Sequence, residues 1–381
     1  MMPTRIARAT LLAAAMLTIM AAAIIAPSLP AMTKVFPGSD VLVRLALTVT
    51  SLAIAMSAPV AGTVADRLGR RPLLVGSLVL YALAGTAGYF VDDLYVLLAT
   101  RALLGAAVGG IMTAVSAMIT DWFEGPRRAS FLGLQQAFAS LGGVIFLPLA
   151  GLLAAVDWKA PFWIYAFAAV IVPFALLAVP ERPRTGGEVT VSPESEHQKR
   201  ILGIYALALV ATLVFYMAPA QLPFLLADFG VGPALTGAVV AGSTVTGVIG
   251  ALAFPVTRNR LNPTMITTAS VLALGAGWVL IGTAGNVALI VIGLLVGGAG
   301  VGLVVPNLNL RLADLAHPAR RGRVLSGLVA GIFLGQFLSP LAVHPLVQTI
   351  GIADAFTYSG AALAVAAVGS AFVTTKERTV R

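Results

Sequence analysis

The chain is built from apolar runs of about 20 residues, separated by short polar or turn-rich breaks. A run of about this length crosses the hydrocarbon core of a bilayer as a helix. Because lipid offers the backbone no hydrogen-bond partners, each run is expected to be helical. The sequence therefore predicts an all-α membrane protein with twelve transmembrane helices. The predicted spans are 10–32, 42–62, 73–91, 94–118, 130–154, 161–180, 202–226, 235–256, 265–284, 288–312, 324–346 and 355–374.

Composition excludes the main alternatives. Of the 381 residues, 59% are hydrophobic and 10% are charged, against about 25% charged residues in soluble domains. Such a chain is neither soluble nor disordered. The net charge of +9 sits in short breaks, so no nucleic-acid partner is expected. The chain has no cysteine and three scattered histidines, and it shows no catalytic triad or paired carboxylates. We expect no metal, no cofactor and no enzyme activity.

Lys and Arg in short loops predict orientation, because they concentrate on the cytoplasmic side. With a cytoplasmic N-terminus, all 24 basic residues lie on the inner side except Lys34, Arg44, Arg101 and Lys159. An even number of spans then places both termini in the cytoplasm. The alternative that the first run is a cleaved signal peptide conflicts with the internal repeat, in which this run matches a later span.

A polar stretch at 181–201 divides the chain into residues 1–180 and 202–381, each with six spans, and its Pro, Gly, Glu and Ser content predicts a cytoplasmic linker. The halves repeat at an offset of about 193 residues. Gly105 and Gly109 match Gly298 and Gly302, and Pro27-Ser-Leu-Pro30 matches Ala220-Gln-Leu-Pro223. Two six-helix bundles related in this way place a substrate site between them, alternately open to each side.

Residues 62–71, G-T-V-A-D-R-L-G-R-R, lie between the second and third spans. This pattern resembles the signature loop of the major facilitator superfamily. Gly62 is expected to allow close helix approach, and Gly69 to form a turn. The resemblance implies that Asp66 and Arg67 hold the outward-open state, and it makes the whole motif a candidate conformational gate: Gly62, Asp66, Arg67, Gly69, Arg70 and Arg71. The alternative is a loop that only sets topology.

Arg101 is the one basic residue deep inside a predicted span, and an intramembrane charge is a functional candidate by default. With Gly105 it resembles the family's span-4 motif, in which the arginine is linked to proton transfer. The alternatives are that Arg101 snorkels outward or ties spans together. All fifteen acidic residues fall in loops or at span ends, so no mid-membrane carboxylate is expected to carry protons. The remaining candidates for coupling are Asp40, Asp66, Asp228 and His344.

Polar residues inside apolar spans outline a candidate substrate cavity. They are Ser28, Gln135, Gln136, Tyr216, Gln221, Asn307, Asn309 and Gln336. Together with nearby methionine and phenylalanine they suit a partly apolar, neutral or anionic small molecule. The alternative is that these groups join helix to helix.

The resemblance is strongest to twelve-span drug:proton antiporters, although the fifth span lacks that group's Gly-Pro dipeptide. It implies the major facilitator fold and a secondary transporter of the bacterial inner membrane, which works as a monomer by alternating access. The expected activity is proton-coupled efflux of drugs or similar compounds. One rival is a dedicated transporter or facilitator for a single metabolite, such as an organic anion. The other is a membrane receptor or assembly protein that transports nothing.

Overall fold

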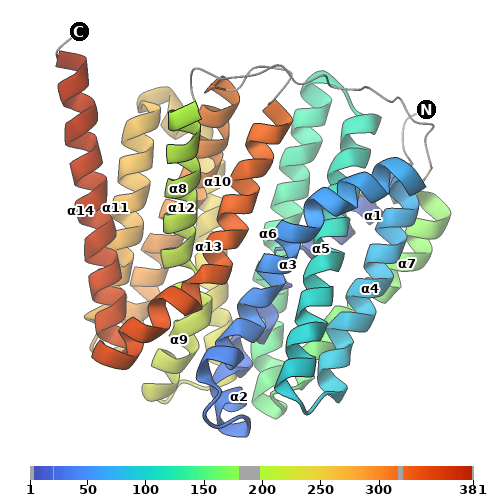
Figure 1. Ribbon diagram of the computed structural model, residues 1–381, viewed down its shortest axis with the longest axis horizontal. Coiled ribbons are helices and arrows are strands. Elements are labelled where there is room, and N and C mark those ends of the chain that lie inside the picture. The colour runs from blue at the N-terminus through green and yellow to red at the C-terminus, as the bar shows by residue number, and fades with distance from the viewer. Residues whose placement is uncertain (1–3, 20, 180–197, 316–320, 380–381) are drawn as a thin grey trace. The chain divides into compact units, whose positions relative to one another are not determined.

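The computed structural model describes residues 4–19, 21–179, 198–315 and 321–379, and these residues form helices joined by short turns (Figure 1). The chain divides into two compact units, Met1–Gly187 with Gly232–Ala238, and Glu188–Val231 with Val239–Arg381. The predicted linker at 181–201 lies mostly outside the described residues. The predicted domain limits therefore stay a prediction.

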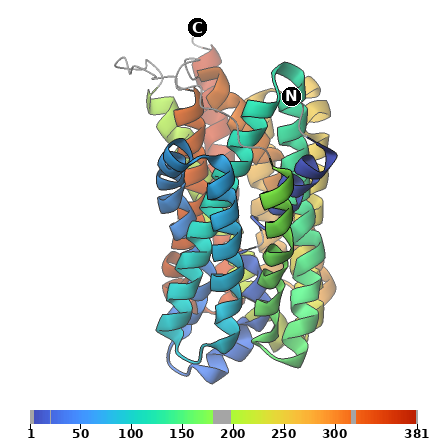
Figure 2. The same cartoon turned by 90° about the vertical axis from the view of Figure 1, so that its right-hand side faces the viewer.

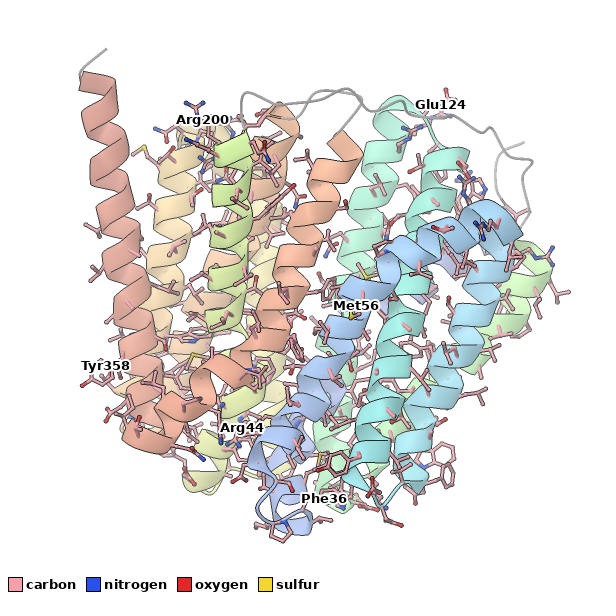
Figure 3. The ribbon with its side chains drawn as sticks, viewed as in Figure 1. Phe36, Arg44, Met56, Glu124, Arg200 and Tyr358 are labelled. Atoms are coloured by element: carbon pink, nitrogen blue, oxygen red, sulfur yellow. The ribbon has the colours of Figure 1, made fainter. Side chains whose placement is uncertain are left out.

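The elements of the first unit follow one another along the chain with short connections. They are α1 (Arg5–Met16), η1 (Ala23–Ser28), α2 (Leu29–Val35), α3 (Asp40–Leu68), α4 (Arg70–Phe90), α5 (Leu94–Trp122), α6 (Gly125–Val156), η2 (Ala160–Ala166) and α7 (Phe167–Ala178). The helices of this unit, coloured blue to green, run nearly parallel to one another (Figure 2). Phe36, which follows α2, and Glu124, which precedes α6, lie at opposite ends of the unit (Figure 3).

The second unit has the same all-helical character. Its elements are α8 (Gln198–Phe215), α9 (Met217–Asp228), α10 (Pro233–Arg260), α11 (Pro263–Gly282), α12 (Val287–Leu315), α13 (Arg321–Ile350) and α14 (Ile352–Thr379). The first residues of α10 belong with the first unit.

Among the residues that the structure describes, ten helical segments are long and apolar enough to cross a membrane, and Ala23–Val35 and Ile352–Val368 are shorter apolar helices. All twelve predicted runs are helical over most of their described residues, so the predicted all-α fold is confirmed. Large apolar side chains such as Met56 and Leu177 are exposed. Exposed apolar side chains of this kind are expected on a surface that contacts lipid.

Glycines bring helices together at matching places in the two units. A Cβ at Gly105 of α5 would collide with the Thr50 carbonyl of α3. In the second unit, a Cβ at Gly298 of α12 would meet the Ser243 carbonyl of α10. Small residues permit this close backbone approach. Because the hydrophobic effect does not drive helices together in lipid, van der Waals packing at such contacts stabilises their association.

Three predicted spans differ in detail from the structure. The first is not one helix, because residues 17–19 and 21–22 form turns between α1 and η1. The seventh is interrupted at Tyr216, between α8 and α9. The second continues past its predicted end to Leu68, so most of the expected loop at 62–71 is helical.

Candidate functional site

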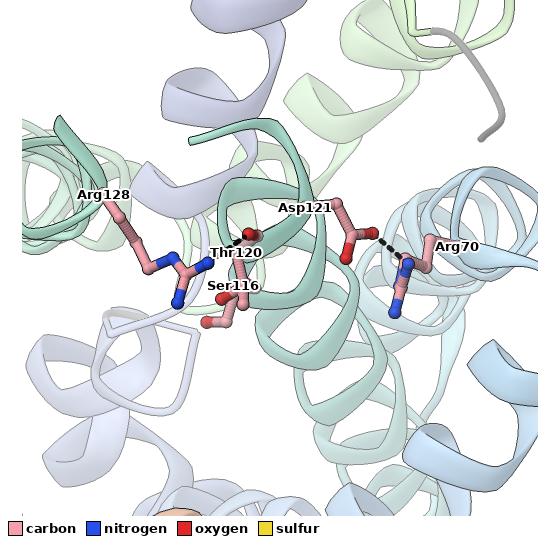
Figure 4. Close-up of polar contacts among 5 residues, drawn as sticks. All are labelled: Arg70, Ser116, Thr120, Asp121 and Arg128. Atoms are coloured by element: carbon pink, nitrogen blue, oxygen red, sulfur yellow. Dashed lines mark hydrogen bonds and ion pairs between the residues drawn. The ribbon is translucent and has the colours of Figure 1, made fainter. Parts of the chain in front are cut away.

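The signature motif is a tight turn between two long helices. Gly69 joins α3 to α4 with a φ of 103°, a left-handed value that favours glycine. Arg70 and Arg71 open α4 directly after it. Arg70 forms an ion pair with Asp121, in the last turn of α5 (Figure 4). The turn thus fixes the start of α4 against the end of α5.

The structure describes the other motif residues only in part. Arg71 donates a hydrogen bond to the Leu176 carbonyl of α7. Arg67 is exposed in the last turn of α3, and Asp66 precedes it, its side chain outside what the structure describes. A Cβ at Gly62 would meet no described atom within 4 Å. The close helix approach expected at Gly62 is therefore wrong for this structure.

The turn between α5 and α6 is tied by a second arginine. Arg128 donates to the Thr120 carbonyl at 3.0 Å (Figure 4). It also donates to the Phe123 carbonyl at 2.9 Å. These carbonyls belong to the C-terminal end of α5, where a helix leaves acceptors unpaired and a cation is favourable. The guanidinium of Arg8, on α1, lies over the Phe123 ring at 5.6 Å. Four of the first unit's helices therefore meet at charged groups near this end.

Arg101 is enclosed inside the first unit, with 1% of its surface exposed. Its Nη2 donates to the carbonyls of Ala84 and Gly85 on α4, at 3.0 and 2.8 Å. Its guanidinium lies 4.8 Å from the Phe162 ring centre and 4.9 Å from that of Tyr165, both on η2. Arg101 does not snorkel outward; it ties α5 to α4 and η2, and its role in coupling stays a prediction.

The second unit has a polar cluster between α11 and α12. Fully buried Asn307 donates to the Pro263 carbonyl at 2.8 Å and to Thr267 Oγ1 at 2.9 Å. Arg311 donates to the same Thr267 oxygen at 3.2 Å. Asn309 instead donates to the Val305 carbonyl of its own helix, at 3.0 Å. For Asn307 the geometry is a helix-to-helix contact, the alternative left open by the sequence.

The remaining candidates differ in burial. Gln135 on α6 donates to Ser116 Oγ on α5 at 3.4 Å. Gln336 on α13 is half-buried, whereas Gln136 and Asp228 are exposed. Ser28, Tyr216, Gln221 and His344 are buried, whereas Asp40 is exposed. Their grouping around one substrate, and the coupling roles of Asp228 and His344, stay predictions.

A small, mostly apolar hollow lies within the second unit, between α8, α12 and α13. It is lined by Ala208, Ala211, Thr212, Phe215, Val301, Val304, Val305, Leu308, Leu328 and Ile332. On α8 the lining recurs at helical spacing, from Ala208 to Phe215. The small side chains of two alanines on α8, Ala208 and Ala211, leave the hollow open. The hollow suits an uncharged apolar group.

The sequence reading missed the aromatic donors Tyr81, Tyr165 and Trp278, all buried and all bonded to backbone carbonyls. A signal was present, because a buried tyrosine hydroxyl or indole N–H usually has a hydrogen-bond partner. The sequence offered no way to name that partner.

Comparison with known proteins gives consistent matches. The model of the Major Facilitator Superfamily matches residues 11–205 and 204–381. The 3-(3-hydroxy-phenyl)propionate transporter of Escherichia coli (strain K12) is 26% identical over 239 residues, 59% of this chain and 59% of that protein. A quinolone resistance transporter of Acinetobacter baumannii is 27% identical over 244 residues, 55% of this chain and 56% of that protein. The matched stretches thus span little more than half of these relatives.

A solved structure shares the fold. It is a bacterial homologue of the human lysosomal transporter Spinster, in an inward-facing and occupied conformation. The two structures align with a TM-score of 0.80 over 97% of this chain and 96% of the other, at 14% sequence identity.

Proposed function

Because the chain belongs to the major facilitator superfamily, a family of multi-pass membrane transporters and not of enzymes, we propose that it is a secondary active transporter. It moves a small organic solute across the bacterial inner membrane by alternating access. The direction is export, and the driving force is exchange for protons. The transported compounds are drugs or chemically similar molecules.

The observation that carries this proposal is the tie between the signature turn and the end of α5. Arg70 and Asp121 are neither fully buried nor fully exposed, with 33% and 23% of their side chains accessible. An ion pair in such surroundings contributes roughly 1 kcal/mol or less. A contact this weak can form and break during a transport cycle, and it is the kind of contact that a gate requires.

The lining of the hollow in the second unit is mostly apolar, which supports a partly apolar solute. Two relatives are named for compounds of this kind, a quinolone and 3-(3-hydroxy-phenyl)propionate. Neither name assigns the substrate of this chain.

A second candidate function has its own support. The sequence has none of its fifteen acidic residues in the middle of a predicted span, and a carboxylate in mid-membrane is a common way to carry protons. One relative is named for a single aromatic acid. The alternative is therefore a dedicated transporter or facilitator for one metabolite, such as an organic anion.

Orientation and assembly belong to the same proposal. The Arg-rich turn at Gly69 and the α5–α6 turn lie on the cytoplasmic side, as the distribution of basic residues favours. Both termini are then cytoplasmic. One chain contains both bundles, so the monomer is the transporting unit.

Everted membrane vesicles with an acidified interior and a pH-sensitive dye test the proposal. The panel contains a quinolone, a lipophilic cation and 3-(3-hydroxyphenyl)propionate. Proton exchange predicts that at least one compound restores the dye signal by releasing protons. The recovery rate should fall in Asp121→Asn. The matched control is Asp92→Asn, which breaks the ion pair with Lys159 at the other end of the same unit.

Two outcomes discriminate further. If none of the compounds restores the dye signal, but labelled 3-(3-hydroxyphenyl)propionate exchanges saturably across the membrane, the single-metabolite transporter is favoured. Neither recovery nor exchange for any compound, with the protein present in the membrane, would contradict both candidates within the tested classes. Equal loss in Asp121→Asn and Asp92→Asn would remove the gate role of the Arg70 pair.

A further inference from the structure

The first span of each unit is interrupted, at neighbouring positions of the internal repeat, since Tyr216 corresponds to Ala23. In the first unit, α1 ends at Met16 and η1 begins at Ala23. In the second, α8 ends at Phe215 and α9 begins at Met217. A break inside a membrane span frees backbone groups that lipid cannot satisfy, so other parts of the protein have to supply partners.

In the first unit two tyrosines supply them. The Tyr81 hydroxyl, from α4, donates to the Leu17 carbonyl at 3.0 Å. The Tyr165 hydroxyl, from η2, donates to the Ala21 carbonyl at 2.6 Å. Both tyrosines are buried, with 1% and 0% of their surface exposed. Hydroxyls inserted in this way take the place of the helix's own hydrogen bonds and hold it open.

In the second unit a tryptophan does the same. Nε1 of Trp278, on α11, donates to the Val214 carbonyl at 2.9 Å. Trp278 is fully buried. Its ring packs against Phe215, the last residue of α8, with ring centres 6.0 Å apart.

The two acceptors correspond in the internal repeat, whereas the two donors do not. Val214 lies 193 residues after Ala21, which is the offset of the repeat. Trp278 lies 193 residues after Gly85, and a Cβ at Gly85 would collide with Tyr165. In the second unit it is Gly297 that leaves room for the Trp278 ring. Each unit thus places a glycine where its own aromatic donor needs space, and both arrangements reach the same carbonyl.

Arg101 packs against Tyr165, the donor to the Ala21 carbonyl in the first unit. Its guanidinium lies over the Tyr165 ring at 4.9 Å and bonds the Gly85 carbonyl at 2.8 Å. A buried cation–π contact is among the stronger ones. Arg101 therefore fixes the ring whose hydroxyl holds the break.

We propose that Tyr165 and Trp278 are positioning residues that hold the break of the first helix in each unit, and that Arg101 acts through Tyr165. The segments they hold carry Ser28 in one unit and Gln221 in the other, both candidate cavity residues. The meaning for transport rests on the proposed function, whereas the control of the break does not.

The chain's lack of cysteine makes the test direct, because introduced cysteines can be spin-labelled without further substitution. One pair, Ile6→Cys with Val35→Cys, brackets the break in the first unit. The other, Leu202→Cys with Phe229→Cys, brackets the break in the second. All four positions are exposed. Distances within each pair are measured by double electron–electron resonance in the purified full-length protein.

The expected result is specific to each unit. Tyr165→Phe should broaden or shift the 6–35 distance distribution by several ångström and leave 202–229 unchanged, and Trp278→Phe should do the reverse. Arg101→Leu should reproduce the Tyr165→Phe effect, because it acts on the same ring. Tyr81→Phe provides a second, milder variant of the first break.

The matched control is Tyr205→Phe. Tyr205 also donates its hydroxyl to a backbone carbonyl, that of Val324 at 2.6 Å, but not at either break. If Tyr205→Phe changes the distances as much as Tyr165→Phe, or if the variants lower only the melting temperature and leave both distributions unchanged, the proposal is overturned. Vesicle assays separate this from the proposed function, since shifted distances without any transport would contradict only the latter.

Discussion

Position 101 in the first unit is an arginine, whereas position 294, which is 193 residues later, is a leucine. Both side chains are buried, with 1% and 0% exposed. The arginine is stabilised because two carbonyls and two aromatic rings surround its guanidinium. At this position of the repeat, the unit with a charged side chain is the one in which carbonyls and aromatic rings surround it.

The contacts between neighbouring spans differ in the same way. In the first unit, Arg70 at the start of α4 pairs with Asp121 at the end of α5. In the second unit, Asn307 of α12 donates to Pro263 and Thr267 near the start of α11. One fold thus joins these helices through an ion pair in one unit, and in the other through hydrogen bonds from the neutral Asn307 amide and the cationic Arg311. Charged ties weaken with salt, whereas neutral ones do not.

The largest effect is expected from giving the second unit the charge of the first. Leu294→Arg places a cation at a fully buried position that holds an apolar side chain, at a cost of about 3 kcal/mol. Thermal unfolding in detergent should show a large loss of stability or of folded yield. Leu294→Met is the control, since it keeps volume and polarity. A stable Leu294→Arg protein would show that no adapted surroundings are needed.

Filling the glycine that faces Tyr165 is expected to rank second. In Gly85→Ala the new Cβ collides with the Tyr165 side chain, and overpacking of this kind costs about 2 kcal/mol. Gly62→Ala is the matched variant, because a Cβ at Gly62 meets nothing within 4 Å. Melting temperatures should fall for the first and not for the second. Equal melting temperatures would mean that α4 and η2 do not pack as the structure has them.

Removing the Asn307 hydrogen bonds should lower the stability of the protein moderately. Asn307→Ala removes two hydrogen bonds to α11, each worth about 0.6 kcal/mol in a membrane protein, so the loss is about 1 kcal/mol. Asn309→Ala removes a bond within α12 only and should lose less. Denaturation midpoints of the two variants decide this, and a larger loss in Asn309→Ala would reverse the assignment.

The smallest effect, and the sharpest distinction between units, concerns salt. Asp121→Asn should cost about 0.5 kcal/mol at low ionic strength and still less in high salt. Asn307→Ala should cost the same in both. Melting curves at low and high sodium chloride provide the measurement. A salt-independent Asp121→Asn would show that the Arg70 pair contributes nothing as an ion pair.

The sequence predicts the spans well because lipid leaves only helices available to long apolar runs. The interruption at Tyr216 could also have been read from Pro219, whose ring clashes with the carbonyl four residues earlier, that of Phe215. The break after Met16 could not, because residues 17–22 contain neither proline nor glycine. It is held by Tyr81 and Tyr165, which lie 64 and 144 residues from the carbonyls they bond.

The candidate site was predictable to a similar, limited degree. The motif pattern located the Gly69 turn, and an arginine in an apolar run pointed to position 101. The partners of Arg70, Arg101 and Asn307 come from other helices, and their identity depends on packing that local patterns do not encode. The residues missed, Tyr81, Tyr165 and Trp278, look like ordinary core residues in the sequence.

Alternating access is the central claim, and labelling of single cysteines tests it without knowledge of the substrate. Gln221→Cys is exposed to a membrane-impermeant maleimide in everted and in right-side-out vesicles, with Leu202→Cys, at the start of α8, as the reference. Alternating access predicts that Gln221→Cys reacts from both faces of the membrane and Leu202→Cys from the cytoplasmic face alone. Reaction of Gln221→Cys from one face only, or from neither, would contradict alternating access.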